Sequence, residues 1–533
     1  MRSDAAVLTA GLLGTAAAAK PDPNTLPLPP MGFNNWARFM TAINESIFVD
    51  AAAAMSTNGL LAAGYNRINL DDAWSTSKRN ATGSMVWDTT KFPQGMPWLT
   101  EHLKSKGFVP GIYSDAGTLS CAADYPGTLG HEDQDLHDFY EWGFEYLKLD
   151  GCYVDDYAKV YGGWIDRMAK FNEGKTSGRV VFSNSAPAYF ASDDDSLSGW
   201  YTTMMQAAAG GQLARHSWDI ATYSSDPAWS SVMGNYGFNV RTTRFQQPGF
   251  FNDPDFIIAD HPGLTLDEKR SQFALWASFS APLIISADIP NLTDDELAFL
   301  TNRDLVAVNQ DPLVQQASLV SRDDQWDVLT KSLVNGDRLL TVLNKGNAAA
   351  DLAVSWARIG VRPDSGATLH VRDLWTGETR SVQASEGGLT ASQVPSHGTA
   401  VLRISGDKLN VVPTGLILNT QSMKCLTDSA SGAATWATCN AADGQTWTVD
   451  QSGRVSSLLN SGSCLGSKDG VVATSKGSCR STWWFPVSGN VIHKKSGLCL
   501  QENKDASISA AKCGTVTDEQ VFGVPVGVGI DYS

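Results

Sequence analysis

The chain has 533 residues, too many for one hydrophobic core, so we expect two or three domains. Its formal net charge of -16 and the lack of any Lys/Arg cluster exclude a nucleic-acid partner, because phosphates require concentrated positive charge. Charged residues make up only 18% of the chain, and its 17 tryptophans suit flat apolar ligands such as sugars as well as protein cores.

The first twenty residues are typical of a secretory signal peptide. Arg2 precedes an apolar stretch from Ala5 to Ala19 that ends in small residues suited to cleavage. No later stretch reaches the roughly 18 apolar residues of a membrane span, and eight cysteines suit disulfides in an oxidising compartment. We therefore expect a secreted, extracellular protein with no membrane partner. Its candidate N-glycosylation sites are Asn44, Asn80 and Asn291.

After a proline-rich lead, residues 21–308 alternate short β-rich runs with longer helix-like stretches. The eight runs are 31–36, 65–74, 109–117, 145–152, 179–187, 214–221, 248–257 and 281–290. Eight strand and helix units in about 270 residues predict a closed (β/α)8 TIM barrel. The active site of such a barrel forms at the C-terminal ends of its strands, where seven of the eight runs carry a polar or charged side chain.

From residue 309 the pattern changes to alternating strands with turn residues. Residues 309–408 predict an antiparallel β-sandwich without a catalytic cluster. Residues 413–533 contain an internal repeat of about 40 residues, in which a Cys-Leu pair precedes a second cysteine and an aromatic residue. This repeat predicts a β-trefoil with one disulfide in each unit: Cys425–Cys439, Cys464–Cys479 and Cys499–Cys513.

The run EYLKLDGC, residues 145–152, brings two charges to the end of a strand that should be buried on both faces. Charges there are costly unless they are paired or used. Lys148 and Asp150 are two residues apart on one face, so Lys148 should favour the ionised form of Asp150. From the residues alone, a structural ion pair remains an alternative, and so does a loop salt bridge for Arg215 and Asp219.

Eight blocks between residues 25 and 405 resemble the glycoside hydrolase family that contains α-galactosidases and α-N-acetylgalactosaminidases. They are PPMGFNNW, NLDDAW, GIYSDAG, YLKLDGC, ARHSWD, FNDPDF, ALWASFSAPLIIS and AVNQDPL. The last segment resembles ricin-type lectin modules, and this order of three domains resembles fungal members. The resemblance implies a retaining exo-α-glycosidase with a carbohydrate substrate, without cofactor or metal.

The resemblance also implies roles for individual residues. Asp150 matches the nucleophile and Asp219 the acid/base, and retaining hydrolysis indeed needs one carboxyl to attack C1 and one to protonate the leaving oxygen. A galacto-configured sugar presents an apolar face, which Trp36 can cover by stacking. Further substrate contacts are implied for Asp71, Asp72, Tyr113, Lys148, Ser185, Ala188, Tyr189, Arg215 and Asp255, and a disulfide beside the sugar for Cys121 and Cys152.

The chain departs from the family pattern in two places. Ala73 stands where relatives usually carry a cysteine, and the partner of that cysteine, expected near Thr41, is also missing. The chain therefore lacks both halves of one family disulfide and keeps no free thiol from it. Galactose-preferring relatives commonly place a glutamate and a leucine where Ser185 and Ala188 fall. The smaller side chains leave space for a 2-acetamido group and favour N-acetylgalactosamine, although a wider pocket still accepts galactose.

Other functions compete with this interpretation. One is a strict α-galactosidase acting on galacto-oligosaccharides and galactomannans. A second is a glycan-binding protein without catalysis, which the presence of both aspartates disfavours. A metal hydrolase is disfavoured because the sequence lacks metal-ligand spacings of His and Cys. A second sugar at the trefoil is possible, but Thr427, Gly466 and Gln501 occupy the positions where the lectin family places a sugar-binding aspartate.

Overall fold

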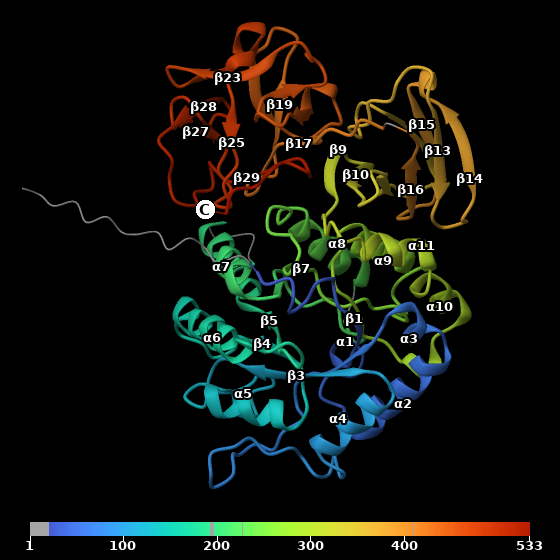
Figure 1. Ribbon diagram of the computed structural model, residues 1–533, viewed down its shortest axis with the longest axis vertical. Coiled ribbons are helices and arrows are strands. Elements are labelled where there is room, and N and C mark those ends of the chain that lie inside the picture. Colours follow the sequence, from blue (N-terminus) through green and yellow to red (C-terminus); the bar gives the residue numbers. More distant parts are fainter. Residues whose placement is uncertain (1–20, 192–196, 226, 408, 533) are drawn as a thin grey trace, which may run out of the picture.

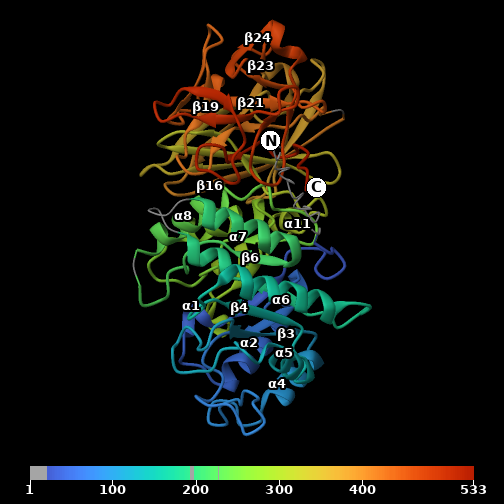
Figure 2. The same ribbon diagram turned by 90° about the vertical axis from the view of Figure 1, so that its left-hand side faces the viewer.

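The computed structural model describes residues 21–191, 197–225, 227–407 and 409–532, and the expected signal peptide lies outside them. The chain forms three domains in sequence order (Figure 1). A barrel in blue to green precedes a yellow and orange β-sandwich and an orange to red trefoil, and the two β domains lie on the same side of the barrel (Figure 2). Among the described helices, none combines the length and the apolar character that crossing a bilayer requires.

Eight parallel strands form the barrel wall, and each expected run supplies one of them. They are β1 (Met31–Asn34), β2 (Arg67–Leu70), β3 (Val109–Asp115), β4 (Tyr146–Asp150), β5 (Val181–Asn184), β6 (Leu213–Arg215), β7 (Phe251–Asp253) and β8 (Leu283–Ile285). Hydrogen bonds connect them in the order β7-β6-β5-β4-β3-β2-β1-β8, and a parallel bridge from Ile257 to Ile285 joins the ends. The expected barrel is confirmed, with strands shorter than their runs because the polar run ends lie in loops.

Helices on the outside of the barrel cover the strands with apolar faces. They are α1 (Trp36–Phe39), α2 (Glu45–Thr57), α3 (Leu60–Ala63), α4 (Met96–Ser105), α5 (Glu132–Glu141), α6 (Tyr157–Asn172), α7 (Leu197–Gly210), α8 (Ala228–Asn239), α9 (Leu266–Ser278), α10 (Asp294–Leu300) and α11 (Arg303–Asn309). Helix α9 begins with a capping box in which Thr265 and Glu268 exchange side-chain and backbone hydrogen bonds. It is almost wholly buried because it lies between the barrel and strands β11 and β16 of the sandwich.

The second domain is the expected antiparallel sandwich. Its strands are β9 (Ser318–Arg322), β10 (Trp326–Ser332), β11 (Arg338–Asn344), β12 (Ala350–Ser355), β13 (Thr368–Asp373), β14 (Thr379–Gln383), β15 (Gly388–Val394) and β16 (Thr399–Ser405), in sheets ordered β14-β13-β16-β11-β10-β9 and β12-β15. The buried ammonium of Lys331 donates hydrogen bonds to Ser280 Oγ (2.7 Å) and the Val308 carbonyl (2.8 Å) of the barrel. A buried donor must keep its partners, so these bonds hold the two domains in one relative position.

The trefoil consists of short antiparallel strands. They are β17 (Thr414–Leu416), β18 (Leu418–Asn419), β19 (Cys425–Asp428), β20 (Ala434–Ala437), β21 (Thr446–Val449), β22 (Val455–Ser457), β23 (Cys464–Lys468), β24 (Val471–Ser475), β25 (Trp483–Trp484), β26 (Ile492–His493), β27 (Cys499–Glu502), β28 (Ile508–Ala511) and β29 (Phe522–Gly523). Each repeat contains its expected disulfide. Trp447 and Trp483 occupy corresponding core positions in two repeats. The Trp447 indole donates a hydrogen bond to the carbonyl of Leu426, and the Trp483 indole donates one to the carbonyl of Leu465.

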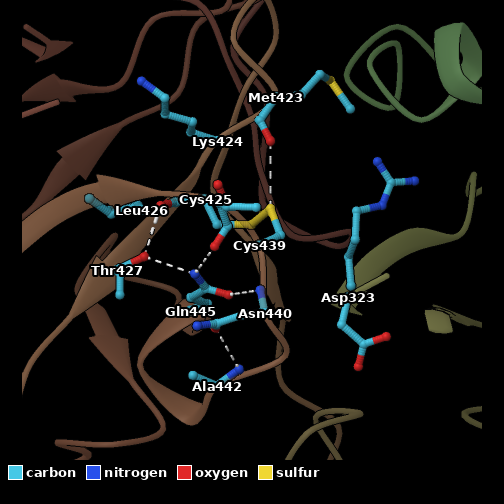
Figure 3. The surroundings of a disulfide bond; sticks show 12 residues. Asp323, Met423, Lys424, Cys425, Leu426, Thr427, Cys439, Asn440, Ala442 and Gln445 are labelled. Atoms are coloured by element: carbon cyan, nitrogen blue, oxygen red, sulfur yellow. Dashed lines mark hydrogen bonds between the residues drawn. A yellow bond between two sulfur atoms is a disulfide. The ribbon is translucent and has the colours of Figure 1, made fainter. Parts of the chain in front are cut away.

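The glutamine of the first repeat shows that its Gln-x-Trp motif is structural. Gln445 accepts a hydrogen bond from Asn440 N (2.8 Å), directly after Cys439, and donates to the Thr438 carbonyl (2.9 Å), as Figure 3 shows in part. Gln520 makes the same pair of contacts after Cys513 in the third repeat. In these two repeats the glutamine side chain therefore holds the backbone on both sides of the second cysteine of the disulfide.

Arg244 anchors the trefoil to the barrel. Its buried guanidinium donates to three trefoil carbonyls, those of Phe522 (2.8 Å), Pro486 (2.8 Å) and Asn490 (3.2 Å). Burial lowers the pKa of Arg244, which has carbonyls rather than a carboxylate as its hydrogen-bond acceptors in this interface. Loss of any of these bonds would leave a buried donor unsatisfied, so the trefoil is fixed to the barrel.

Lys91 connects the two positions at which the family disulfide is missing. Its ammonium donates to the carbonyl of Ala73 (2.6 Å) and, at a longer distance of 3.5 Å, to that of Thr41. Ala73 has a φ of 72°, a left-handed conformation that costs free energy outside glycine. A charged hydrogen bond thus holds together two loops that a disulfide would otherwise join.

We expect Lys91→Met to lower the apparent Tm of the protein by about 2–6 °C, because hydrogen bonds of a charged donor are worth about 1.5–3 kcal/mol. Differential scanning calorimetry would measure the shift. Lys78→Met, a change of an exposed lysine in the loop after β2, is the matched control and should leave the Tm within about 1 °C. Equal shifts in the two variants would contradict a bridging role for Lys91.

Candidate active site

A cavity of about 290 Å³ opens at the C-terminal ends of the barrel strands. Its lining residues lie in the last residues of strands β3, β4 and β6 or in the segments after β1 to β6, where the fold predicts an active site. They are Trp36, Asp71, Tyr113, Cys121, Asp150, Cys152, Ser185, Ala188, Tyr189, Arg215, Ser217, Trp218 and Asp219. The volume is near the lower end of small-ligand pockets, about 300–1,000 Å³, and suits one sugar ring.

Lys148 lies behind this cavity and pairs with two carboxylates of its wall. Its ammonium is 3.0 Å from Asp71 Oδ2 and 3.8 Å from Asp150 Oδ2, and it lies 5.2 Å from the centre of the Tyr113 ring. Burial disfavours the charge of Lys148, but Asp150 and Asp71 raise its pKa above the usual value. The lysine is therefore a permanent cation beneath the cavity floor.

The net effect on Asp150 differs from the prediction. The charge of Lys148 does lower the pKa of Asp150, as expected from their spacing. Burial acts in the opposite direction and outweighs it, so the pKa of Asp150 is raised above its ordinary value. The spacing of residues revealed the neighbouring charge but not the desolvation, which depends on the whole barrel.

Arg215, the last residue of β6, holds the opposite side of the cavity. Its Nη2 atom lies 2.9 Å from Asp255 Oδ2 and 3.1 Å from Asp219 Oδ1. Asp255 is fully enclosed, and burial raises its pKa to about 7 against the charge of Arg215. Asp219 lies at the rim with 66% of its side chain exposed. Although the cavity wall disfavours its charge, Arg215 and then Lys148 lower the pKa of Asp219.

Three hydroxyl groups on the cavity wall have no hydrogen-bond partner within the protein. The buried oxygens belong to Tyr113, Ser185 and Ser217. A buried polar atom without a partner costs about 1–3 kcal/mol, so buried groups are nearly always hydrogen-bonded. Together with the carboxylates, these hydroxyls can satisfy a ligand that carries many hydroxyl groups.

The cavity brings most of the expected binding residues together, and three lie outside its wall. Lys148 and Asp255 lie one layer deeper, where they pair with wall residues. Asp72 accepts backbone hydrogen bonds from Ala73 (2.6 Å) and Ala122 (3.0 Å) through different carboxylate oxygens. It thereby joins the loop after β2 to the loop after β3.

Sequence reasoning missed two wall residues, Ser217 and Trp218. Both lie within the Arg-x-x-x-Asp pattern, between Arg215 and Asp219, so their closeness to the site was readable from the motif. The Arg215 guanidinium donates to the carbonyls of both residues at 3.3 Å. These bonds fold the segment tightly around the arginine and turn both side chains to the cavity.

The disulfide Cys121–Cys152 forms part of the wall. Asp115 supports it from beneath, because its carboxylate accepts hydrogen bonds from Cys152 N (2.9 Å) and Gly117 N (2.7 Å). Among the described residues, Asp115 and these two cysteines are the one group of possible metal ligands close enough to share an ion. The disulfide engages both sulfurs, so this group offers no thiolate ligand.

The three trefoil positions that correspond to the lectin aspartates are occupied structurally. Thr427 accepts a hydrogen bond from the Gln445 side chain (3.0 Å). Any side chain at Gly466 would meet Ser478 atoms at 2.7 Å. Gln501 binds the side chains of Gln520 (2.8 Å) and Asn503 (3.0 Å). None of these three positions presents a carboxylate to a sugar.

Three family descriptions match the chain in succession. Residues 28–311 match alpha galactosidase A, and residues 323–404 match the alpha galactosidase C-terminal beta sandwich domain. Residues 413–522 match the ricin-type beta-trefoil lectin domain. These divisions coincide with the three structural domains described above.

Known proteins are similar over most of the chain. Alpha-galactosidase A of Aspergillus niger is 48% identical over 526 residues, covering 95% of this chain and 93% of that protein. Alpha-galactosidase of Cyamopsis tetragonoloba is 33% identical over 369 residues, covering 69% of this chain and 84% of that protein. The crystal structure of alpha-galactosidase I from Mortierella vinacea matches with a TM-score of 0.62 and 27% identity, over 73% of this chain and 99% of that one.

We expect Arg215→Met to destabilise the protein by about 3–5 kcal/mol at neutral pH, because Asp255 would lose the buried partner that offsets its desolvation and would have to stay charged alone or take up a proton. The substitution removes a charge that lowers the pKa of Asp255, so the folded-state pKa rises further above the unfolded value of about 3.9. The stability of the variant then falls as the pH rises from the unfolded-state pKa of Asp255 to its folded-state pKa. The loss of Tm relative to the wild type should therefore be larger at pH 7.5 than at pH 4.

Calorimetry of both proteins at the two pH values would measure this dependence. Arg38→Met is the matched control, since Arg38 is one-third exposed and lies 3.4 Å from Asp260 at the surface. Its loss should cost less than about 1 kcal/mol. A deficit for Arg215→Met that did not change with pH would contradict the buried pairing.

Proposed function

The chain belongs to the α-galactosidase A family of glycoside hydrolases, and on this premise we propose that it is a retaining exo-α-glycosidase for terminal α-linked galactose and N-acetylgalactosamine. The observation that carries the proposal is the placement of Asp150 and Asp219 on one small cavity, each beside its own cation. Because the cavity suits one sugar ring, only the end of a glycan enters it.

Hydrolysis then proceeds by double displacement. A carboxylate oxygen of Asp150 attacks C1 of the bound sugar while the bond from C1 to the leaving oxygen breaks, and Asp219 donates its proton to that oxygen. The product of this step is a sugar joined covalently to Asp150. Asp219, now ionised, takes a proton from a water molecule whose oxygen attacks C1 and releases Asp150. The two inversions at C1 give net retention.

The proton must lie on Asp219 and not on Asp150 when the reaction begins. When the cavity holds no sugar, the pKa shifts favour a proton on Asp150 over one on Asp219, because the pKa of Asp150 is raised and that of Asp219 is lowered. A sugar in the cavity would remove water from the exposed Asp219 side chain, which raises the pKa of a carboxyl. Asp150 is already desolvated and keeps Lys148 beside it. Substrate binding therefore favours the protonated form of Asp219.

The wall formed by Ser185 and Ala188 supports the N-acetylgalactosamine part of the proposal. Both residues line the cavity. Ala188 lies in the short 3-10 helix η1 (Ala186–Phe190), and Ser185 lies directly before it. The Ser185 hydroxyl is buried without a protein partner, so it can donate to the carbonyl of a 2-acetamido group. Ala188 adds no bulk in that direction. Galactose still fits, because a larger space rejects a smaller ligand only weakly.

Secretion follows from independent features and is part of the proposal. Four disulfides join all eight cysteines, an arrangement typical of oxidising compartments. The three candidate glycosylation residues, Asn44, Asn80 and Asn291, are exposed in the structure. These features agree with the signal peptide predicted at residues 1–20.

Proton NMR tests the mechanism directly. We expect hydrolysis of a nitrophenyl α-galactoside to release the α-anomer first, because two inversions restore the configuration. Asp150→Asn, the matched variant, should lose more than about 99% of turnover, since the amide cannot form the glycosyl ester. Early β-anomer would exclude retention, and substantial turnover by the variant would exclude Asp150 as nucleophile.

A substitution of the Ser185 wall tests the sugar specificity. Ser185→Glu combined with Ala188→Leu should lower kcat/KM for a nitrophenyl α-N-acetylgalactosaminide by about tenfold or more relative to the galactoside, because the larger side chains fill the space for the acetamido group. Side-by-side rates of both proteins on both sugars give this ratio. An unchanged ratio would refute the proposed pocket, and a wild type active only on galactose would identify a strict α-galactosidase.

A further inference from the structure

We propose that Trp218 forms a binding site for the sugar on the leaving-group side of the substrate, outside the cavity that holds the terminal sugar. The inference rests on the proposed function of Asp219 as the proton donor. It concerns a different part of the substrate from the Ser185 wall, namely the ring that departs.

The Trp218 side chain is exposed and yet held in place. It is 47% exposed, although it lines the cavity. Its ring packs edge to face against Phe238 with 5.2 Å between centroids, and its indole N–H donates to the Ala191 carbonyl. An aromatic surface that is fixed before binding loses little entropy when a ligand covers it. The exposed part of the ring is therefore available as a rigid platform.

The same arginine holds Trp218 and the proposed acid. The same nitrogen of Arg215 donates to the Trp218 carbonyl at 3.3 Å and to Asp219 Oδ1 at 3.1 Å. Asp219 must lie next to the oxygen that leaves, because it protonates that atom. A ring attached to this oxygen thus emerges beside Asp219, next to Trp218.

The cavity itself has no space for this second ring. Its volume of about 290 Å³ suits the terminal sugar alone, so the next sugar must rest on the rim. Among the described residues, the exposed large aromatics are Tyr153, Tyr189, Trp218 and Trp484, and only Tyr189 and Trp218 line the cavity. Tyr189 contacts the disulfide sulfurs at 3.3 and 3.4 Å, whereas Trp218 belongs to the segment that Arg215 holds.

The chemistry of the rim favours a neutral pyranose as the departing group. One face of a pyranose is largely C–H and packs on an aromatic ring, while its hydroxyls remain in water or bind polar groups. An anionic group that approaches this place would be repelled by Asp219 as long as that carboxyl is still ionised. A lipid would need a continuous apolar surface, and on this rim the exposed apolar side chains are Tyr189 and Trp218 alone among the described residues.

A comparison of two substrates distinguishes an effect on binding of the departing ring from an effect on catalysis. An α-1,6-linked galactosyl disaccharide and methyl α-galactoside both release an alcohol of similar basicity and need the same proton from Asp219. Only the disaccharide carries a second ring. We expect Trp218→Ala to lower the ratio of kcat/KM for the disaccharide to that for the methyl galactoside by about tenfold, the scale of one lost aromatic contact. Trp218→Phe, which keeps a flat ring, should restore most of this ratio.

Trp484→Ala is the matched control, because Trp484 is an exposed tryptophan of the trefoil at 36% exposure. It should leave the ratio unchanged. An equal loss on both substrates in Trp218→Ala would show that Trp218 supports Asp219 and would overturn the platform, as would no loss on either. A wild-type protein that hydrolyses neither substrate would instead refute the proposed function.

Discussion

Two buried cations hold the polar groups of the cavity together. Lys148 lies 3.0 Å from Asp71 and 3.8 Å from Asp150, and Arg215 lies within 3.1 Å of both Asp219 and Asp255. Removing an ion from water costs several kcal/mol, so neither the cations nor the enclosed carboxylates are stable there alone. The set forms at the ends of strands β2, β4, β6 and β7, which the barrel brings together from distant segments of the chain.

The same pairing gives the two proposed catalytic carboxyls different surroundings. Asp150 lies deep beside Lys148, whereas Asp219 lies at the rim and is largely exposed. A ligand that fills the cavity changes the solvation of Asp219 much more than that of Asp150. The arginine also fixes the backbone of Trp218, so the rim on that side is rigid before any substrate arrives.

Buried donors fix the two β domains to the barrel, in addition to the exposed ion pair between Arg372 of the sandwich and Asp304 of the barrel. Lys331 donates to barrel oxygens, and Arg244 donates to three trefoil carbonyls. Neutral acceptors avoid the cost of enclosing a second charge, but each donor would be unsatisfied if the domains separated. The three domains therefore form one body.

The sequence by itself determined the eight barrel strands, the sandwich and the three disulfide repeats, because strand periodicity and cysteine spacing are local properties. It also identified Lys148, Asp150, Arg215 and Asp219, since each pair lies within one short motif at a strand end. Only the tertiary structure decided that Asp72 joins two loops, that Lys91 connects Thr41 with Ala73, and that Trp218 lies exposed beside the rim. It also decided that burial outweighs Lys148 in setting the pKa of Asp150. Desolvation and contacts between loops depend on segments far apart in the chain, and no local pattern records them.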